Sequence, residues 1–290
     1  MTLMPPSMNE YSMSPRFNPS IMLFRYTDES DRTHLDAAVI VTLGKGATAL
    51  AERLRDYVLS IPERELTRHH LEPLAVLPLT PTGIGEVERF VPTVVAISGL
   101  LSAEEIAFAA RLMERGEHCT VMVDAETEIR PEWRSVVRLP PGLSRDEQWL
   151  SGMQAYLEAL FNFGLIGFDS YMVHECTRSR LCQFSLVHVP GKSKLISAAE
   201  AAVQDLAKRC DLAACDTFLL LIHWSSWVKM KRIHWIVQAC RNALAEFRDD
   251  EYQLVIADLP TESGFAISLM AGTPRPIHLP APHPDHLIVW

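Results

Sequence analysis

The sequence lacks any uninterrupted apolar stretch that could cross a membrane. A spanning helix needs roughly 20 apolar residues, and the run FLLLI at 218–222 has only the length of a buried strand. The segment MTLMPPSMNEYSMSPRFNPS at the start also has no apolar core of the kind found in secretion signals. We therefore expect no membrane span and a cytoplasmic location.

Clusters of basic residues are also scarce. The chain has 27 Lys and Arg against 36 Asp and Glu, so its formal net charge is -9. Nucleic acids and anionic membranes attract clustered Lys and Arg. The one basic run, KMKR at 229–232, is short and is predicted to be the solvated start of a helix. The composition therefore argues against nucleic acid as a partner.

Cysteine patterns typical of metal or disulfide sites are missing. The six cysteines form no C-x-x-C pair. His174, Cys176 and Cys182 are close in sequence, but their spacing matches no standard set of zinc ligands. We expect reduced, mostly buried thiols and no metal site.

What the chain does have is an alternation of strand-like and helix-like segments. The β-α-β order predicts an α/β fold with a mostly parallel sheet, in which strands at 37–43 and 92–98 lie side by side. The segment at 144–163 has a broad apolar helical face, so we expect a core helix between this sheet and a second unit. Four further strands are predicted at 182–189, 216–224, 252–259 and 264–272, with helices at 194–209 and 229–247.

Residues 164–206, GLIGFDSYMVHECTRSRLCQFSLVHVPGKSKLISAAEAAVQDL, resemble a segment of the FtsZ/tubulin family. In that family the segment runs from the end of the central helix, through a loop facing the next subunit, into the second domain. DTFLLLIHW, the helix at 229–247 and GFAISLMAGT continue the resemblance in order and spacing. Upstream, VTLGKGATAL resembles the first glycine loop, and VVAISGLL with ARLMERGEHCTVMVD resembles the elements around the tubulin signature.

The resemblance spans about residues 37–273 and implies an FtsZ/tubulin-like α/β fold. Such a fold has a Rossmann-like domain with a mostly parallel sheet, a central helix and a smaller second α/β domain. The expected organisation is a flexible leader at 1–35, a shortened and degenerate nucleotide-binding-like domain at 36–143, the central helix at 144–163, a second, activation-type domain at 164–273 and a Pro-rich tail at 274–290.

The nucleotide-binding loops depart most from the family pattern. Family members bind guanine nucleotide on glycine-rich loops whose backbone amides cradle the phosphates. The signature GGGTGTG should follow Gly99, where this chain reads SGLLSAEEIAFAA. Ser102 and Glu105 form an S-x-x-E capping box there, which satisfies the free amides of the helix with its own side chains. Glu104 and Glu105 also place negative charge where it would repel a phosphate.

Four positions are the candidate nucleotide contacts that the resemblance implies. Gly44 and Gly46 remain from the first loop, and Gly99 precedes the signature position. Glu147 falls where the family recognises the guanine base. An ordinary turn is the alternative that we favour for Gly44 and Gly46, and for Glu147 we favour a capping box with Ser144.

The loop at 164–174 is the candidate catalytic segment. In FtsZ-like proteins this loop completes the GTPase site of the neighbouring subunit, and an asparagine and two acidic residues orient the attacking water. Carried over by position, these three become Gly167, Asp169 and Met172. Asp169 is therefore the candidate catalytic residue, and the alternative that we favour is that it caps a helix beginning at Ser170.

We expect a structural or regulatory cytoskeletal homologue that has lost GTP hydrolysis and needs no cofactor. Its partner would be a second copy or another FtsZ/tubulin-like subunit. The first alternative is an active GTPase that forms filaments with GTP and magnesium and uses Asp169 in trans. The second is a small-molecule enzyme on a related α/β fold, although no G-x-S-x-G motif appears and neither His223 nor His234 belongs to a triad pattern.

Three tryptophans surround the start of the helix at 229–247. We expect at least two of Trp224, Trp227 and Trp235 to be buried or to line a subunit contact. Isolated exposed tryptophans are disfavoured, and this residue type is enriched at contact centres.

Overall fold

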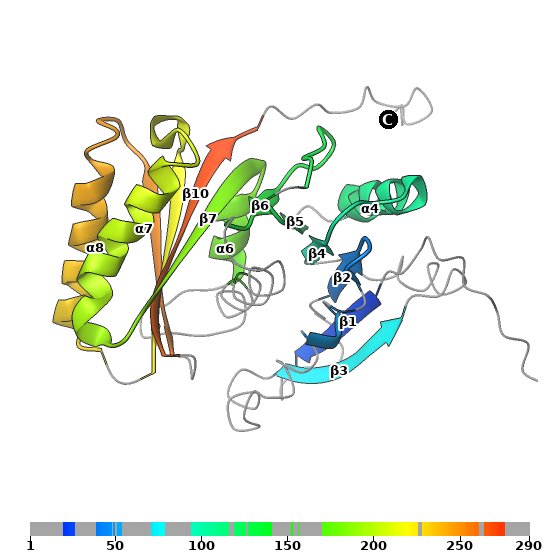
Figure 1. Ribbon diagram of the computed structural model, residues 1–290, viewed down its shortest axis with the longest axis horizontal. Helices are drawn as coiled ribbons and strands as arrows, with labels where there is room; N and C mark the ends of the chain where they lie inside the picture. The colour runs from blue at the N-terminus through cyan, green and yellow to red at the C-terminus, as the bar shows by residue number, and fades with distance from the viewer. Residues whose placement is uncertain are drawn as a thin grey trace, which may run out of the picture.

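A single ten-stranded sheet organises the described part of the chain, in the order β3-β1-β2-β4-β5-β6-β7-β10-β8-β9 (Figure 1). The computed structural model describes residues 20–26, 39–47, 49, 51–53, 71–78, 94–115, 119–125, 127–140, 152, 156, 170–225, 228–260 and 264–275. The strands are β1 Ser20–Tyr26, β2 Val39–Leu43, β3 Leu71–Pro78, β4 Val94–Ile97, β5 Thr120–Val123, β6 Val136–Arg138, β7 Arg180–Val189, β8 Thr217–Trp224, β9 Gln253–Pro260 and β10 Phe265–Pro274. The helices are α4 Ala103–Arg115, α6 Ser170–Thr177, α7 Leu195–Ala207 and α8 Met230–Leu244, with short 3-10 turns η1 Lys192–Lys194 and η2 Leu212–Ala214.

Strands β2, β4, β5, β6 and β7 form the parallel centre of the sheet. Val41 pairs with Val95 and Leu43 with Ile97, which confirms that the strands predicted at 37–43 and 92–98 lie side by side. Every residue of β4 and β5 is buried, as expected for parallel strands covered on both faces. Helix α4 contributes Phe108 to the apolar core on this part of the sheet.

The second half of the sheet is mixed. β10 pairs antiparallel with both β7 and β8, while β8 and β9 are parallel. Helices α7 and α8 pack side by side over one face of these strands (Figure 1). Their apolar stripes form a second core with the strands, and its members fall between positions 195 and 271 of the sequence. No helix in the described part of the chain is long and apolar enough to cross a membrane.

A buried polar cluster joins the two halves around Tyr156. Its hydroxyl donates to Thr120 Oγ1 of β5 at 3.0 Å, and the Thr120 hydroxyl lies 3.2 Å from that of Thr177 in α6. Within the predicted core helix at 144–163, only positions 152 and 156 are described, and both are helical. At Tyr156 this segment therefore contacts both the parallel sheet and the second half of the molecule.

The predicted flexible leader at 1–35 is wrong for residues 20–26, because they form β1 between β2 and β3. The sequence SIMLFRY is rich in apolar and aromatic residues, which favour strands. β3 was also not predicted, since LEPLAVLP contains Pro73 and Pro78. Proline is tolerated on edge strands, and β3 is an edge of this sheet. The rest of the leader and residues 276–290 lie outside the described residues.

The histidine of β8 has a polar partner that the sequence did not reveal. His223 Nε2 lies 2.8 Å from Ser268 Oγ of β10. Both residues are buried within the sheet, at 3% and 0% exposure. This contact satisfies polar atoms inside the core, and it has no open access for a substrate.

Candidate functional site

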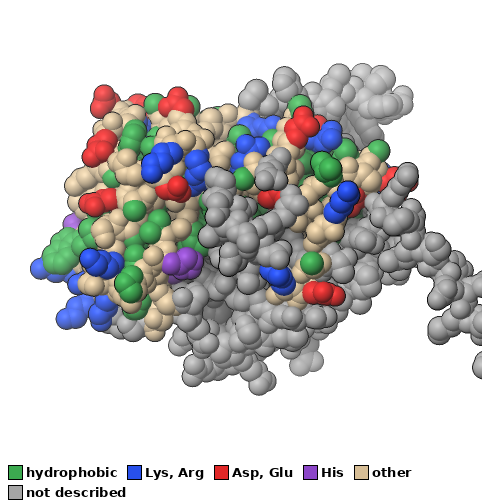
Figure 2. All heavy atoms as spheres, in the orientation of Figure 1, with side chains coloured by type: hydrophobic (Ala, Val, Ile, Leu, Met, Phe, Trp, Pro, Cys, Tyr) green, Lys and Arg blue, Asp and Glu red, His purple; other side chains and the backbone are tan. Residues whose placement is uncertain are grey.

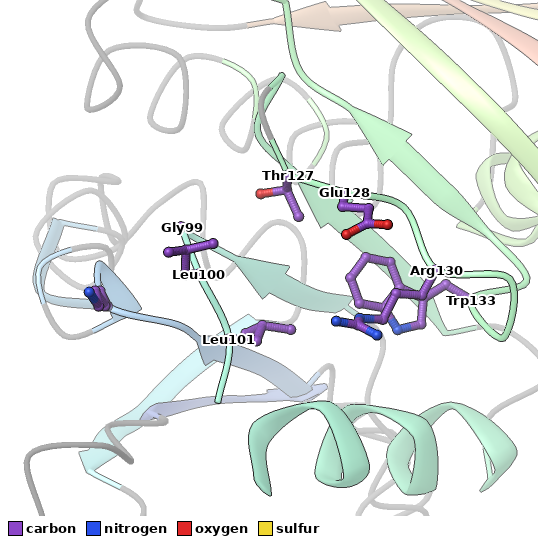
Figure 3. A pocket seen from close by; sticks show the side chains of 8 residues that line it. Gly99, Leu100, Leu101, Thr127, Glu128, Arg130 and Trp133 are labelled. Carbon is purple, nitrogen blue, oxygen red and sulfur yellow. The ribbon is translucent and has the colours of Figure 1, made fainter. Parts of the chain in front are cut away.

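A cavity of about 510 Å³ lies beyond the carboxyl ends of the parallel strands. Open α/β sheets bind ligands at this edge, because the loops that follow neighbouring strands converge there. Figure 3 shows the loop after β4 on one side and the loop after β5 on the other, with α4 nearby. The lining residues are Lys45, Gly99, Leu100, Leu101, Thr127, Glu128, Arg130 and Trp133.

The lining combines charge with one large aromatic ring. Lys45 and Arg130 supply two cations, and Glu128 supplies one carboxylate. Trp133 is almost fully buried, and its indole Nε1 has no hydrogen-bond partner among the described residues. A cavity lined by an aromatic side chain and a few charged groups is typical of small-molecule sites.

Contacts from distant parts of the chain fix the wall formed by residues 124–133. Asp124 Oδ1 accepts from the Thr127 backbone N-H at 2.7 Å. Arg275, which follows β10, donates to the carbonyl oxygens of Trp133 at 2.8 Å and of Arg130 at 3.1 Å. Partial burial lowers the pKa of Arg275. The wall is thus held in place by Asp124, which follows β5, and by Arg275, which follows β10.

The G-K-G turn after β2 packs closely against Ser98 at the end of β4. Gly44 has φ +91, and a Cβ there would lie 2.5 Å from the Ser98 carbonyl oxygen. The Gly46 N-H donates to that same oxygen at 3.1 Å, and a Cβ on Gly46 would collide with the Ser98 side chain. The chain therefore needs both glycines for packing, whether or not a ligand binds.

Glu105 connects the two loops that face the cavity region. The predicted capping box is confirmed: Glu105 N donates to Ser102 Oγ at 3.2 Å, and Ser102 N donates to Glu105 Oε2 at 2.8 Å. The other oxygen, Oε1, accepts from Gly44 N at 2.9 Å. Glu105 is only 3% exposed. One buried carboxylate thus accepts from an amide of the first loop and an amide of the loop after β4.

Three of the predicted site residues come together at this edge. Gly44, Gly46 and Gly99 lie in the adjoining loops after β2 and β4, and their role in nucleotide binding stays a prediction. Glu147 and Asp169 lie outside the described residues, although α6 does begin at Ser170 as predicted.

Sequence reasoning missed most of the cavity lining. Lys45 stands between the two glycines of the first loop, and Glu128, Arg130 and Trp133 belong to no sequence motif. The available signal was the polar stretch AETEIRPEW at 125–133, which follows the strand-like apolar segment HCTVMVD at 118–124. A polar loop at the carboxyl end of a parallel strand is a typical ligand-facing segment.

Solved structures similar to this one are FtsZ/tubulin-like, whereas no family model and no curated protein matches the sequence. The W319Y mutant of FtsZ from M. jannaschii aligns with a TM-score of 0.50 and 12% identity, over 67% of this chain and 68% of that chain. An empty FtsZ dimer from M. jannaschii gives 0.51 and 12%, over 66% of both chains. CetZ1 from Haloferax volcanii, a GDP-bound monomer, gives 0.44 and 10%, over 69% of both.

The two FtsZ alignments show that this chain has an FtsZ/tubulin-like fold. This confirms the fold that the sequence resemblance implies. One side of the cavity and the Glu105 contacts lie in the loops where that resemblance placed the family's phosphate-binding glycines.

Proposed function

We propose that this protein is an FtsZ/tubulin-like cytoskeletal homologue that associates with copies of itself or a related subunit and does not hydrolyse GTP. The observation that carries this proposal is the position of Glu105. Its carboxylate accepts hydrogen bonds from Gly44 N and Ser102 N. These amides belong to the two loops that would bind a phosphate, and they already donate to an anionic group of the protein.

Electrostatics explains why this contact opposes nucleotide binding. Backbone amides stabilise a phosphate when they are free to donate to it. Here two of them already donate to a buried carboxylate, and a phosphate placed beside that carboxylate would meet a like charge. Binding would therefore require the Glu105 carboxylate to leave its partners.

Self-association is supported by the fold. One of the aligned M. jannaschii FtsZ structures is described as a dimer. A protein that keeps this fold without the catalytic loop residues can still present surfaces to another subunit, since fold and chemistry are separable.

The second candidate function is a GTP-binding, filament-forming GTPase. The observation that favours it is the cavity of about 510 Å³, which falls within the roughly 300–1,000 Å³ typical of ligand pockets. In this case GTP and magnesium would occupy the cavity edge, and Asp169 would act on a neighbouring subunit.

A phosphate-release assay with GTP and magnesium, run beside an equilibrium binding assay with labelled GTP, separates the two candidates. We expect neither turnover nor saturable binding for the natural chain. Glu105→Ala is the informative variant, because it frees both amides and is expected to raise GTP affinity. Turnover by the natural chain that Asp169→Ala abolishes would overturn the proposal in favour of the GTPase.

A further inference from the structure

The starts of α7 and α8 meet at one end of the helical layer and form a single basic surface. Arg232 Nη1 donates to the Lys192 carbonyl oxygen at 2.7 Å, which brings the run KSK at 192–194 beside KMKR at 229–232. No Asp or Glu occurs in residues 186–199 or 224–245. We define the basic surface by its five cations, Lys192, Lys194, Lys229, Lys231 and Arg232.

Two large apolar side chains are exposed on the basic surface. Met230 is 55% exposed and Trp235 is 45% exposed, and Lys231 Nζ lies 5.0 Å from the centre of the Trp235 ring. Figure 2 shows basic and apolar side chains gathered along the edge of the molecule formed by α8. Tryptophan and methionine are enriched in protein contacts, and tryptophan is a frequent energetic centre of them. Trp235 is thus exposed in the isolated chain, Trp224 is half-buried against the second core and Trp227 lies outside the described residues, so the expectation for the three tryptophans stays a prediction.

The opposite end of the same helical layer is acidic. Gln204 Nε2 donates to Glu246 Oε2 at 3.2 Å, so the ends of α7 and α8 are adjacent there as well. With α8 15 residues long, the two ends are separated by about 22 Å. The acidic surface consists of the exposed carboxylates of Asp211, Glu246, Asp249, Asp250 and Glu251.

The acidic surface keeps a negative excess despite its neighbours. Arg248 is buried and pairs with Asp250 at 2.8 Å, but the Asp250 side chain remains 69% exposed. Lys208 and Arg241 are exposed cations at this end, and Arg209 pairs with Asp205 of α7. The five carboxylates outnumber the three cations Lys208, Arg241 and Arg248. The helical layer therefore carries positive charge at the helix starts and negative charge beyond the helix ends.

We propose that the basic surface of one copy binds the acidic surface of a second copy, with Trp235 at the centre of the contact. Because the two surfaces are different, each bound copy leaves one of them free, and the contact propagates head to tail into an open chain. The net charge of -9 does not prevent this, since charges more than about 8 Å apart are largely screened at physiological ionic strength. The contact rests on the proposed self-association, and it requires no nucleotide.

Two neutralised variants test this contact by sedimentation velocity without nucleotide. Lys229→Gln with Lys231→Gln weakens the basic surface, and Asp249→Asn with Glu251→Gln weakens the acidic surface. The natural chain is expected to assemble at physiological ionic strength and to dissociate as salt rises further. Each variant alone is expected to assemble at least about tenfold more weakly, since complementary charges at a contact set its strength and salt dependence.

Mixing the two variants gives the most specific result. Each retains one intact surface, so an equimolar mixture is expected to form a one-to-one complex that does not grow further. The matched control is Arg111→Gln with Arg134→Gln, which removes two exposed cations on α4 and on the loop before β6 and should assemble like the natural chain. Trp235→Ala is expected to weaken assembly about tenfold while the circular dichroism spectrum stays unchanged.

Several outcomes would overturn the contact. They are a natural chain that stays monomeric at physiological ionic strength, neutralised variants that assemble normally, or a mixture that forms no complex. Binding of the natural chain to phosphatidylserine vesicles in place of self-assembly, lost on changing Lys229 and Lys231, would assign the basic surface to a membrane instead. GTP turnover would overturn the proposed loss of hydrolysis and leave this contact standing, so the two failures are distinguishable.

Discussion

At the scale of single residues, Glu105 has more partners than its sequence pattern requires. A capping box needs only the reciprocal contacts with Ser102. The additional bond from Gly44 N makes the same carboxylate a bridge between segments 61 residues apart. Such a long-range partner cannot be predicted from sequence spacing, because it depends on β2 and β4 lying side by side.

Replacing Glu105 with alanine is expected to destabilise the fold by about 1–3 kcal/mol, since two donors would lose a buried, charged acceptor. Urea unfolding followed by circular dichroism measures this change. Glu104→Ala is the matched control, because Glu104 is exposed in the same turn and should shift stability by less than about 0.5 kcal/mol. Equal effects for the two variants would contradict the bridging role of Glu105.

The pair Cys210 and Cys215 provides a prediction for pH. The hydrogen bond from Cys210 lowers the pKa of Cys215 to about 7 from an ordinary value of 9.0. Thiolate absorbance assigned to Cys215, from the difference between the natural chain and Cys215→Ser, should therefore rise as pH increases through about 7.

Cys210→Ala supplies the check on the cause of this shift. Removing the donor should move the titration of Cys215 toward the ordinary value of 9.0. Cys240 is an internal reference, because burial raises its pKa to about 12, and it should contribute no thiolate near neutral pH. A Cys215 titration that stays the same in Cys210→Ala would assign the shift to another neighbour.

At the scale of elements, the regular helices and strands could be predicted from the sequence and several short connections could not. Helices α4, α7 and α8 have clear apolar stripes, and β8 is a buried run throughout except at its last residue. β6 has only three residues, too few to show any periodicity. The cavity lining was missed for a related reason, since its side chains come from loops after different strands and meet only in the folded sheet.

The turn that follows β2 tolerates no side chain at Gly44. Gly44→Ala is expected to cost about 1–3 kcal/mol, because the residue has φ +91 and its Cβ would lie 2.5 Å from a backbone oxygen. Gly191→Ala is the control, since its φ of 177 is extended and nothing lies within 4 Å of the added carbon. Thermal or urea unfolding compares the two. A Gly44 variant as stable as the Gly191 variant would show that this turn is more adaptable than its packing indicates.

At the scale of the whole molecule, two apolar cores share one sheet. The first core lies between β2 and β6, and the second lies under α7 and α8. The resemblance of residues 37–273 predicted the overall architecture, because it rests on the order and spacing of the helices and strands along that whole segment. β1 and β3 at one edge of the sheet could not be predicted in the same way. β1 lies outside the resemblance, and β3 lies within its weakest part.

The pairing of β6 with β7 has a mechanical consequence. Val136, Val137 and Arg138 pair with Leu181, Cys182 and Gln183, and the buried hydroxyl of Tyr156 ties the same two halves together. Any swivel of one half against the other would have to shear these backbone hydrogen bonds and expose buried polar groups. Each subunit should therefore behave as a stiff body, and an assembly built from such subunits would flex at the joints between them.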